Sequence, residues 1–199
     1  MSEQVAPQGT VVWITGRPAS GKSTLGGYLA SRLRADGVPC ALLDGDEVRD
    51  ALGRAAGRGP EERDAFYEAL ARLAALLARQ GLSVIVPATA HRRAYRERAR
   101  SLAPRFIEIH VATPPDECAR RDPKGLYALA REGAAVGLPG ADEPFEDPVA
   151  PDVIALDGED ERALAHALAL LRLARSRARV HLGVFGWRPG EPSASRRWK

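Results

Sequence analysis

Hydrophobic and polar positions divide the chain into short apolar runs separated by longer segments with helical spacing. Short apolar runs indicate strands, and apolar residues that recur every three or four positions indicate helices. The apolar runs predict strands at 10–15, 39–44, 82–88, 105–111 and 151–156. The remaining periodic segments predict helices at 21–34, 47–52, 61–80, 92–100, 115–121 and 159–175. This alternation predicts an α/β fold with a central parallel sheet that is covered by helices.

The length of 199 residues fits one domain with short extensions. We predict a flexible N-terminus over 1–9, a folded domain over 10–176 and a basic, disordered tail over 177–199. The segment 122–147 has neither helical nor strand periodicity. A long irregular segment inside a compact domain is typical of a lid or a binding loop.

Charge is distributed unevenly along the chain, whose formal net charge is +3. The segment 172–199 carries eight basic residues and one acidic residue, whereas the preceding part has an excess of acidic residues. We therefore expect that the folded body does not bind nucleic acid. Attachment of the basic tail to RNA or to acidic lipid is an alternative that the sequence leaves open.

Apolar runs in this chain stay below the roughly 18 residues that a membrane-spanning helix requires, so we expect no membrane association. The first residues show no basic segment followed by an apolar core, as a secretory signal would. Cys40 and Cys118 lack the CxxC spacing of a metal or redox site. Two reduced thiols in a cytoplasmic protein are the expectation.

The stretch 16-GRPASGKS-23 lies directly between the first predicted strand and the first predicted helix. It has the spacing GxxxxGK[ST] of a phosphate-binding P-loop, in which main-chain N–H groups and the helix N-terminus surround phosphate oxygens. We expect Lys22 to neutralise phosphate charge and the Ser23 hydroxyl to bind Mg²⁺. The predicted ATP-binding residues are Gly16, Ala19, Ser20, Gly21, Lys22, Ser23 and Thr24.

A second polar stretch, 44-DGDEVR-49, follows the second predicted strand. Ligands of open parallel sheets bind at the carboxyl ends of the strands, where this stretch lies. Asp44 and Asp46 provide one carboxylate that can face the metal ion and another that can orient a hydroxyl group. Arg49, about one helical turn later, can meet an anion on the acceptor. The pattern therefore favours a small-molecule kinase that uses ATP and Mg²⁺, although DGD is also a common turn.

Several segments together resemble the adenylylsulfate kinases, which phosphorylate the 3′-hydroxyl of adenosine 5′-phosphosulfate (APS) with ATP. The similar segments are WITGRPASGKST, LDGDEVR, GLSVIV, 121-RDPKGLY-127 and GADEPFEDPVAPD. The resemblance implies a three-layer P-loop kinase fold and a mobile lid that contains Arg121, Lys124 and Arg131. It also implies that Arg121 contacts the nucleotide, that Lys124 is catalytic with Lys22, Asp44 and Asp46, and that Arg63 binds the acceptor.

The departures from the family pattern fall on the acceptor side. The family usually has two aromatic residues that enclose the adenine of APS, and here these positions are Arg58 and Leu138. Phe66 replaces the family's asparagine, and Ala90 replaces a serine in the segment 88-ATAHR-92. An arginine can itself stack on a base, so Arg58 could recover part of the lost contact.

Three functions stay open at this level. The first is an APS kinase in which Asp46, Arg49, Arg63, Lys124, Arg58 and Leu138 contact the acceptor. The second is a related kinase for another small hydroxyl compound, and the third is a nucleotide-binding regulator without catalysis. His91 ends the central strand and either contacts substrate or lies at the surface. Formation of a homodimer is also open.

Overall fold

The computed structural model describes residues 8–53, 59–133 and 137–180, with side chains described as far as residue 176. Its core is a five-stranded parallel sheet with the order β2-β3-β1-β4-β5. The strands are β1 (Val11–Thr15), β2 (Cys40–Leu42), β3 (Ser83–Pro87), β4 (Phe106–Val111) and β5 (Val153–Ala155). The predicted α/β class and parallel sheet are therefore confirmed.

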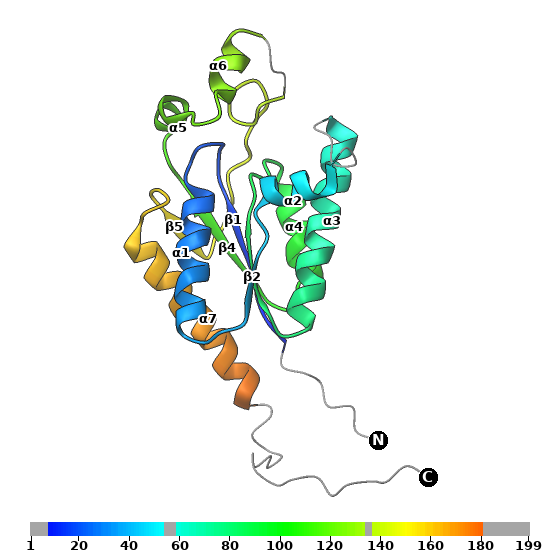
Figure 1. Ribbon diagram of the computed structural model, residues 1–199, viewed down its shortest axis with the longest axis vertical. Coiled ribbons are helices and arrows are strands. Elements are labelled where there is room, and N and C mark those ends of the chain that lie inside the picture. Colours follow the sequence, from blue (N-terminus) through cyan, green and yellow to red (C-terminus); the bar gives the residue numbers. More distant parts are fainter. Residues whose placement is uncertain (1–7, 54–58, 134–136, 181–199) are drawn as a thin grey trace, which may run out of the picture.

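Helices cover both faces of the sheet and make it the middle layer of three (Figure 1). On one face lie α1 (Lys22–Ala35) and α7 (Glu161–Val180), which pack against each other. On the other face lie α3 (Pro60–Arg79) and α4 (Arg93–Leu102). The shorter helices are α2 (Gly45–Leu52), α5 (Pro115–Arg121) and α6 (Leu126–Arg131).

The central strand β1 shows why the sequence forms this sandwich. All five of its residues are buried, as expected for a parallel strand with helices on both faces. Because side chains alternate along a strand, Val12 and Ile14 join the core beneath α1 and α7. Val11 and Trp13 join the second core, beneath α3 and α4.

The structure differs most from the predicted elements at α6, α7 and β2. The segment predicted to be irregular contains α6, which begins at Leu126. The residue before it, the N-cap Gly125, has a φ of 67°, which favours glycine. Helix α7 continues to Val180, five residues beyond the predicted end, so the first part of the predicted tail is helical. Strand β2 is only three residues long, because Asp44 already caps α2. Residues 1–7 and 181–199, and with them the predictions of flexible ends, lie outside the described residues.

The loops that follow β1, β2 and β3 all lie at the carboxyl edge of the sheet. Figure 1 shows α5, α6 and the segment after them beyond this edge, opposite the end of the sheet where α7 ends. The fold thus brings the P-loop, the DGDEVR stretch and the lid segment to one place. Within the described residues, no helix is long and apolar enough to cross a bilayer.

Candidate active site

The loop between β1 and α1 is shaped by residues with unusual backbone angles. Gly21 has a φ of 99°, and Ala19 has a φ of 61°. A Cβ atom on Gly21 would lie 2.6 Å from the backbone nitrogen of Gly158, so the position requires glycine for two reasons. Gly16 and Ser20 are buried beneath the loop, and the Ser20 carbonyl accepts a 2.8 Å hydrogen bond from the Thr113 hydroxyl. Both residues support the loop from inside.

Lys22 is the first residue of α1, and its Nζ donates a 2.7 Å hydrogen bond to the Arg17 carbonyl. Burial lowers the pKa of Lys22 to about 8, although the nearby Asp46 carboxylate opposes the shift. A buried ammonium group that has lost part of its hydration gains strongly from a new anionic partner. Lys22 is therefore placed to bind a phosphate group, which would stabilise its charged form.

Oxygen atoms suited to Mg²⁺ meet where β2 ends. The Ser23 hydroxyl donates to Asp44 Oδ2 at 2.5 Å, and Asp44 Oδ1 accepts from the backbone N–H of Asp46 at 2.9 Å, which caps α2. Mg²⁺ binds one or two hard protein oxygens and completes its shell with phosphate and water. The paired Ser23 and Asp44 oxygens fit that requirement. Among the described residues, no cluster of three or more His, Cys, Asp or Glu side chains offers a larger metal site.

The lid segment reaches back over this edge of the sheet. Lys124 Nζ lies 2.6 Å from Asp46 Oδ2, in an ion pair between two exposed side chains. The Tyr127 hydroxyl donates a 3.2 Å hydrogen bond to the Pro18 carbonyl in the P-loop. Tyr127 also forms a small apolar cluster with Cys118 and Leu138. The lid therefore has a core of its own and contacts both acidic and phosphate-binding parts of the site.

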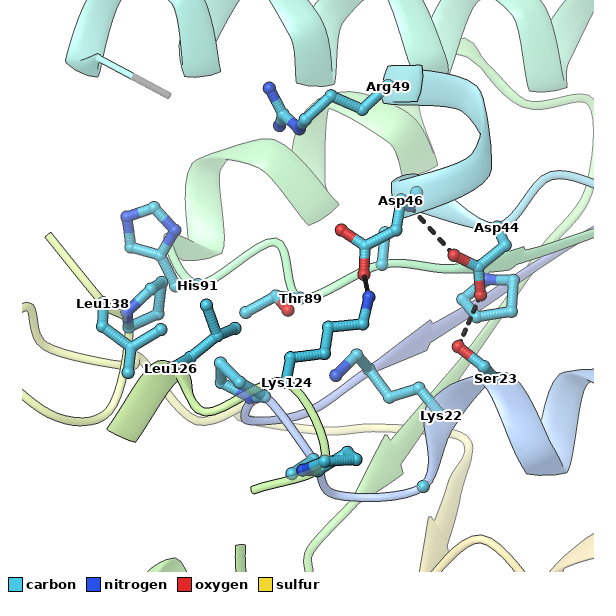
Figure 2. A pocket seen from close by; sticks show the side chains of 18 of the residues that line it. Lys22, Ser23, Asp44, Asp46, Arg49, Thr89, His91, Lys124, Leu126 and Leu138 are labelled. Atoms are coloured by element: carbon cyan, nitrogen blue, oxygen red, sulfur yellow. Dashed lines mark hydrogen bonds and ion pairs between the residues drawn. The ribbon is translucent and has the colours of Figure 1, made fainter. Parts of the chain in front are cut away.

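These elements enclose a cavity of about 650 Å³ (Figure 2). Its size lies within the range of ligand pockets, about 300–1,000 Å³. The predicted site residues that line it are Ala19, Gly21, Lys22, Ser23, Thr24, Asp44, Asp46, Arg49, Arg63, Arg121, Lys124 and Leu138. Arg131 ends α6 and is exposed, and Arg58 lies outside the described residues.

A smaller cavity of about 300 Å³ adjoins the main one. Gly21, Thr24 and Arg121 line both cavities, and Asp157, Gly158 and Glu159, which follow β5, complete the smaller one. The smaller cavity thus links the phosphate-binding loop to Arg121, the residue predicted to contact the nucleotide. The two cavities thus meet at the P-loop.

On the opposite side of the main cavity, charged side chains converge on Glu143 of the lid segment. Arg63 from α3 forms an ion pair with Glu143 and donates to the Gly137 carbonyl. His91 Nε2 lies 2.8 Å from the same carboxylate. Burial lowers the pKa of His91, although the carboxylate opposes this shift. His91 is 1% exposed, so the alternative of a surface position was wrong.

Two residues predicted to contact the acceptor have unexpected surroundings. Leu138 packs into the lid cluster, and the guanidinium carbon of Arg49 lies 3.7 Å from the centre of the Phe66 ring. In Figure 2, Arg49 reaches from α2 across the top of the cavity, above Asp46 and His91. The side of the cavity that we predict to hold the acceptor is therefore bounded by Arg49, His91 and the lid.

Sequence reasoning missed Glu143, Thr89 and Gly158. Glu143 is 80 positions after Arg63, and no local spacing links the two residues. Its place in the GADEPFEDP segment was the only signal available. Thr89 lines the cavity because it follows β3. Gly158 is recognised as part of the site only from its backbone contact with Gly21 in the structure.

Comparisons with known proteins agree with this geometry. A family model described as adenylylsulphate kinase matches residues 8–156. An adenylyl-sulfate kinase from Picosynechococcus sp. is 42% identical over 146 residues, or 73% of this chain and 82% of that protein. A probable bifunctional SAT/APS kinase from Sorangium cellulosum is 38% identical over 165 residues; the match covers 82% of this chain but 28% of that longer protein.

Among solved structures, the APS kinase CysC of Mycobacterium tuberculosis in complex with AMPPNP and APS superposes with a TM-score of 0.78. The match covers 84% of this chain and 99% of that chain, at 34% sequence identity. This TM-score shows that the two chains share one fold.

Proposed function

The chain belongs to the adenylylsulfate kinase family, and we propose that it transfers the γ-phosphoryl group of ATP to the 3′-hydroxyl of APS. The products would be ADP and 3′-phosphoadenosine 5′-phosphosulfate, and the hydroxyl proton would leave to a base or to water. One observation carries the proposal: Lys22 of the P-loop and Asp46 of α2 line the same cavity, and Lys124 of the lid closes over Asp46.

On the nucleotide side, the chain positions phosphate groups by charge and main-chain geometry. Lys22 and the N-terminus of α1 attract the β- and γ-phosphates of ATP, and Thr24 and Arg121 line the adjoining space. Ser23 and Asp44 are the residues that would hold Mg²⁺. When bound, this ion would neutralise charge on the phosphates.

On the acceptor side, Asp46 is the residue that orients the attacking hydroxyl and accepts its hydrogen bond. Lys124 holds Asp46 in place through its ion pair and adds a positive charge near the transferring group. Arg49 and Arg63 both line the cavity, and they are the cations that would meet the anionic part of the acceptor. Catalysis in this arrangement comes mainly from positioning and charge neutralisation, as in other phosphoryl transfers.

A different hydroxyl acceptor is the second candidate, and the surroundings of Leu138 favour it. The Leu138 side chain packs against Tyr127 and Cys118, so much of its apolar area contacts these residues and not a ligand. Loss of stacking contacts costs roughly 1–3 kcal/mol per base where it has been measured. An acceptor without adenine would not require that contact.

Release of ADP, coupled to a spectrophotometric readout, tests these candidates. With purified protein, ATP and Mg²⁺, we expect turnover on APS that falls by at least about a hundredfold in Asp46→Asn. A panel of other small hydroxyl compounds run in parallel identifies the second candidate if one of them is the better substrate. Tight ATP binding with no turnover on any acceptor would instead support the non-catalytic regulator.

Assembly and compartment remain part of the proposal. A homodimer is the assembly state that we propose to test by light scattering. Cys40 and Cys118 are both free thiols, which fits the reducing cytoplasm. Binding of nucleic acid is not expected from the acidic body of the chain.

A further inference from the structure

An aromatic side chain lies directly against the arginine of the DGDEVR stretch. The guanidinium carbon of Arg49 is 3.7 Å from the centre of the Phe66 ring, well inside the distance of about 6 Å at which a cation and an aromatic face attract. Both residues line the main cavity. Phe66 is 4% exposed, so one face of the guanidinium group contacts a buried ring.

The ring of Phe66 is itself fixed by its neighbours. It meets the edge of Tyr67 with ring centres 5.4 Å apart. The Tyr67 hydroxyl accepts a 2.9 Å hydrogen bond from the backbone N–H of Ala90, and its ring stacks on Tyr95 at 4.4 Å. Phe66 is therefore held by a row of aromatic residues that is anchored to the loop after β3.

Stacking constrains the plane of a guanidinium group but leaves its hydrogen-bond donors usable, because the N–H groups point outward within that plane. On α2, Arg49 lies three residues after Asp46 and therefore on the same side of the helix. Donors on Arg49 can thus meet an anion on a molecule whose hydroxyl lies at Asp46. A side chain fixed before binding loses less conformational entropy when the ligand arrives.

We propose that Phe66 is a positioning residue: it fixes the guanidinium plane of Arg49 so that the N–H edge receives the sulfate- or phosphate-type oxyanion of the acceptor. The inference rests on the proposed function, since it concerns the acceptor of that reaction. Arg63 contacts Glu143 and Gly137 of the lid, so its position depends on the lid.

Nuclear magnetic resonance of the protein saturated with ADP and Mg²⁺ tests the proposal without turnover. ADP keeps the probe, sodium sulfate, away from the P-loop. In the wild type we expect the Arg49 Nε–H resonance to be shifted by the ring current of Phe66 and to move further with sulfate. In Phe66→Leu the ring-current shift should vanish and sulfate binding should weaken about fivefold or more. Phe66→Tyr, which keeps the ring, should restore both.

A matched control removes another phenylalanine that contacts an arginine. Arg100 lies 4.6 Å from the centre of the Phe106 ring, and neither residue lines the main cavity. We expect Phe106→Leu to leave the affinity for sulfate unchanged. This variant separates loss of the particular contact at Arg49 from a general loss of core packing.

A double-mutant cycle shows whether Phe66 acts through Arg49. In the Arg49→Ala background, Phe66→Leu should have no further effect on sulfate affinity, measured from backbone amide shifts in α2, or on the KM for the acceptor. The same loss in both backgrounds would overturn the proposal, as would unchanged sulfate affinity in Phe66→Leu or an Arg49 resonance insensitive to sulfate. Absence of turnover on APS would instead refute the proposed function, while the sulfate titration still decides the role of Phe66.

Discussion

The contact between Gly158 and the P-loop gives a prediction that depends only on backbone geometry. Gly158 follows β5, and a Cβ atom placed on it would lie 2.5 Å from the Gly21 carbonyl oxygen and 2.9 Å from the Gly21 Cα. Its backbone angle is one that other residues adopt, since Gly158 is absent from the positive-φ glycines of the described chain. The effect of Gly158→Ala is therefore purely steric.

The size of the effect follows from these distances. Non-bonded carbon contacts are most favourable at about 3.5–4.0 Å, so the two loops must separate by roughly 1 Å. The clashing atoms are main-chain atoms, so no side-chain rotation relieves the overlap. Overpacking of this kind costs about 1–3 kcal/mol. Because Gly21 belongs to the phosphate-binding loop, the substitution also disfavours the loop conformation that binds ATP. We expect ATP affinity to fall about tenfold for each 1.4 kcal/mol by which that conformation is destabilised.

Urea unfolding and calorimetric titration with a non-hydrolysable ATP analogue measure both consequences. The control is Gly27→Ala in α1, where a Cβ atom would meet nothing within 4 Å. Replacing a glycine inside a helix with alanine stabilises by roughly 0.5–1 kcal/mol, so the control should be slightly more stable and bind normally. If Gly158→Ala is as stable as the wild type and binds the analogue equally well, the described contact between the two loops is wrong.

Three further predictions concern charged groups of the site. At pH 9, nucleotide binding should take up about one proton through Lys22, because phosphate restores the ammonium form that is lost near pH 8. Calorimetry in buffers of different ionisation enthalpy measures this proton uptake. Equal apparent binding enthalpies in all buffers would contradict the prediction. Lys124→Ala should change the free energy of unfolding by less than about 0.5 kcal/mol, because its ion pair with Asp46 is exposed. The same substitution should reduce kcat at least about tenfold. An unchanged kcat would show that Lys124 has no role in catalysis. Burial lowers the folded-state pKa of His91, so the unfolded chain binds its proton first as pH falls below about 6.5. Urea unfolding at pH 8 and pH 5 should therefore show a larger loss of stability in the wild type than in His91→Gln, and an identical loss would exclude this role.

The fold and the meeting of the P-loop with the DGDEVR stretch at one cavity could be predicted from the sequence because their signals are local. The P-loop occupies consecutive positions between a strand and a helix, and 44-DGDEVR-49 lies directly after the next strand in the chain. Parallel strands bring such segments to one edge without further information. The short helix α6 was missed because its six residues lie between glycine-containing segments and give too few turns for periodicity to be seen.

The acceptor side could not be predicted in the same way, because its contacts join distant parts of the chain. Glu143 pairs with Arg63 across 80 positions, and it meets His91 across 52 positions. Neither pair follows a helical or strand period. Phe66 was recognised as a departure from the family pattern, but its contact with Arg49 depends on how α2 and α3 pack.

Phosphorus NMR of a reaction mixture tests most directly whether one cavity joins the P-loop to a hydroxyl acceptor. Purified protein is incubated with ATP, Mg²⁺ and APS, and the phosphorus spectrum is followed with time. We predict that ATP signals decline as those of ADP and a new 3′-phosphate monoester rise together, and that Asp46→Asn suppresses both changes. ATP that stays intact, or that yields only inorganic phosphate in the presence of APS, would contradict the account.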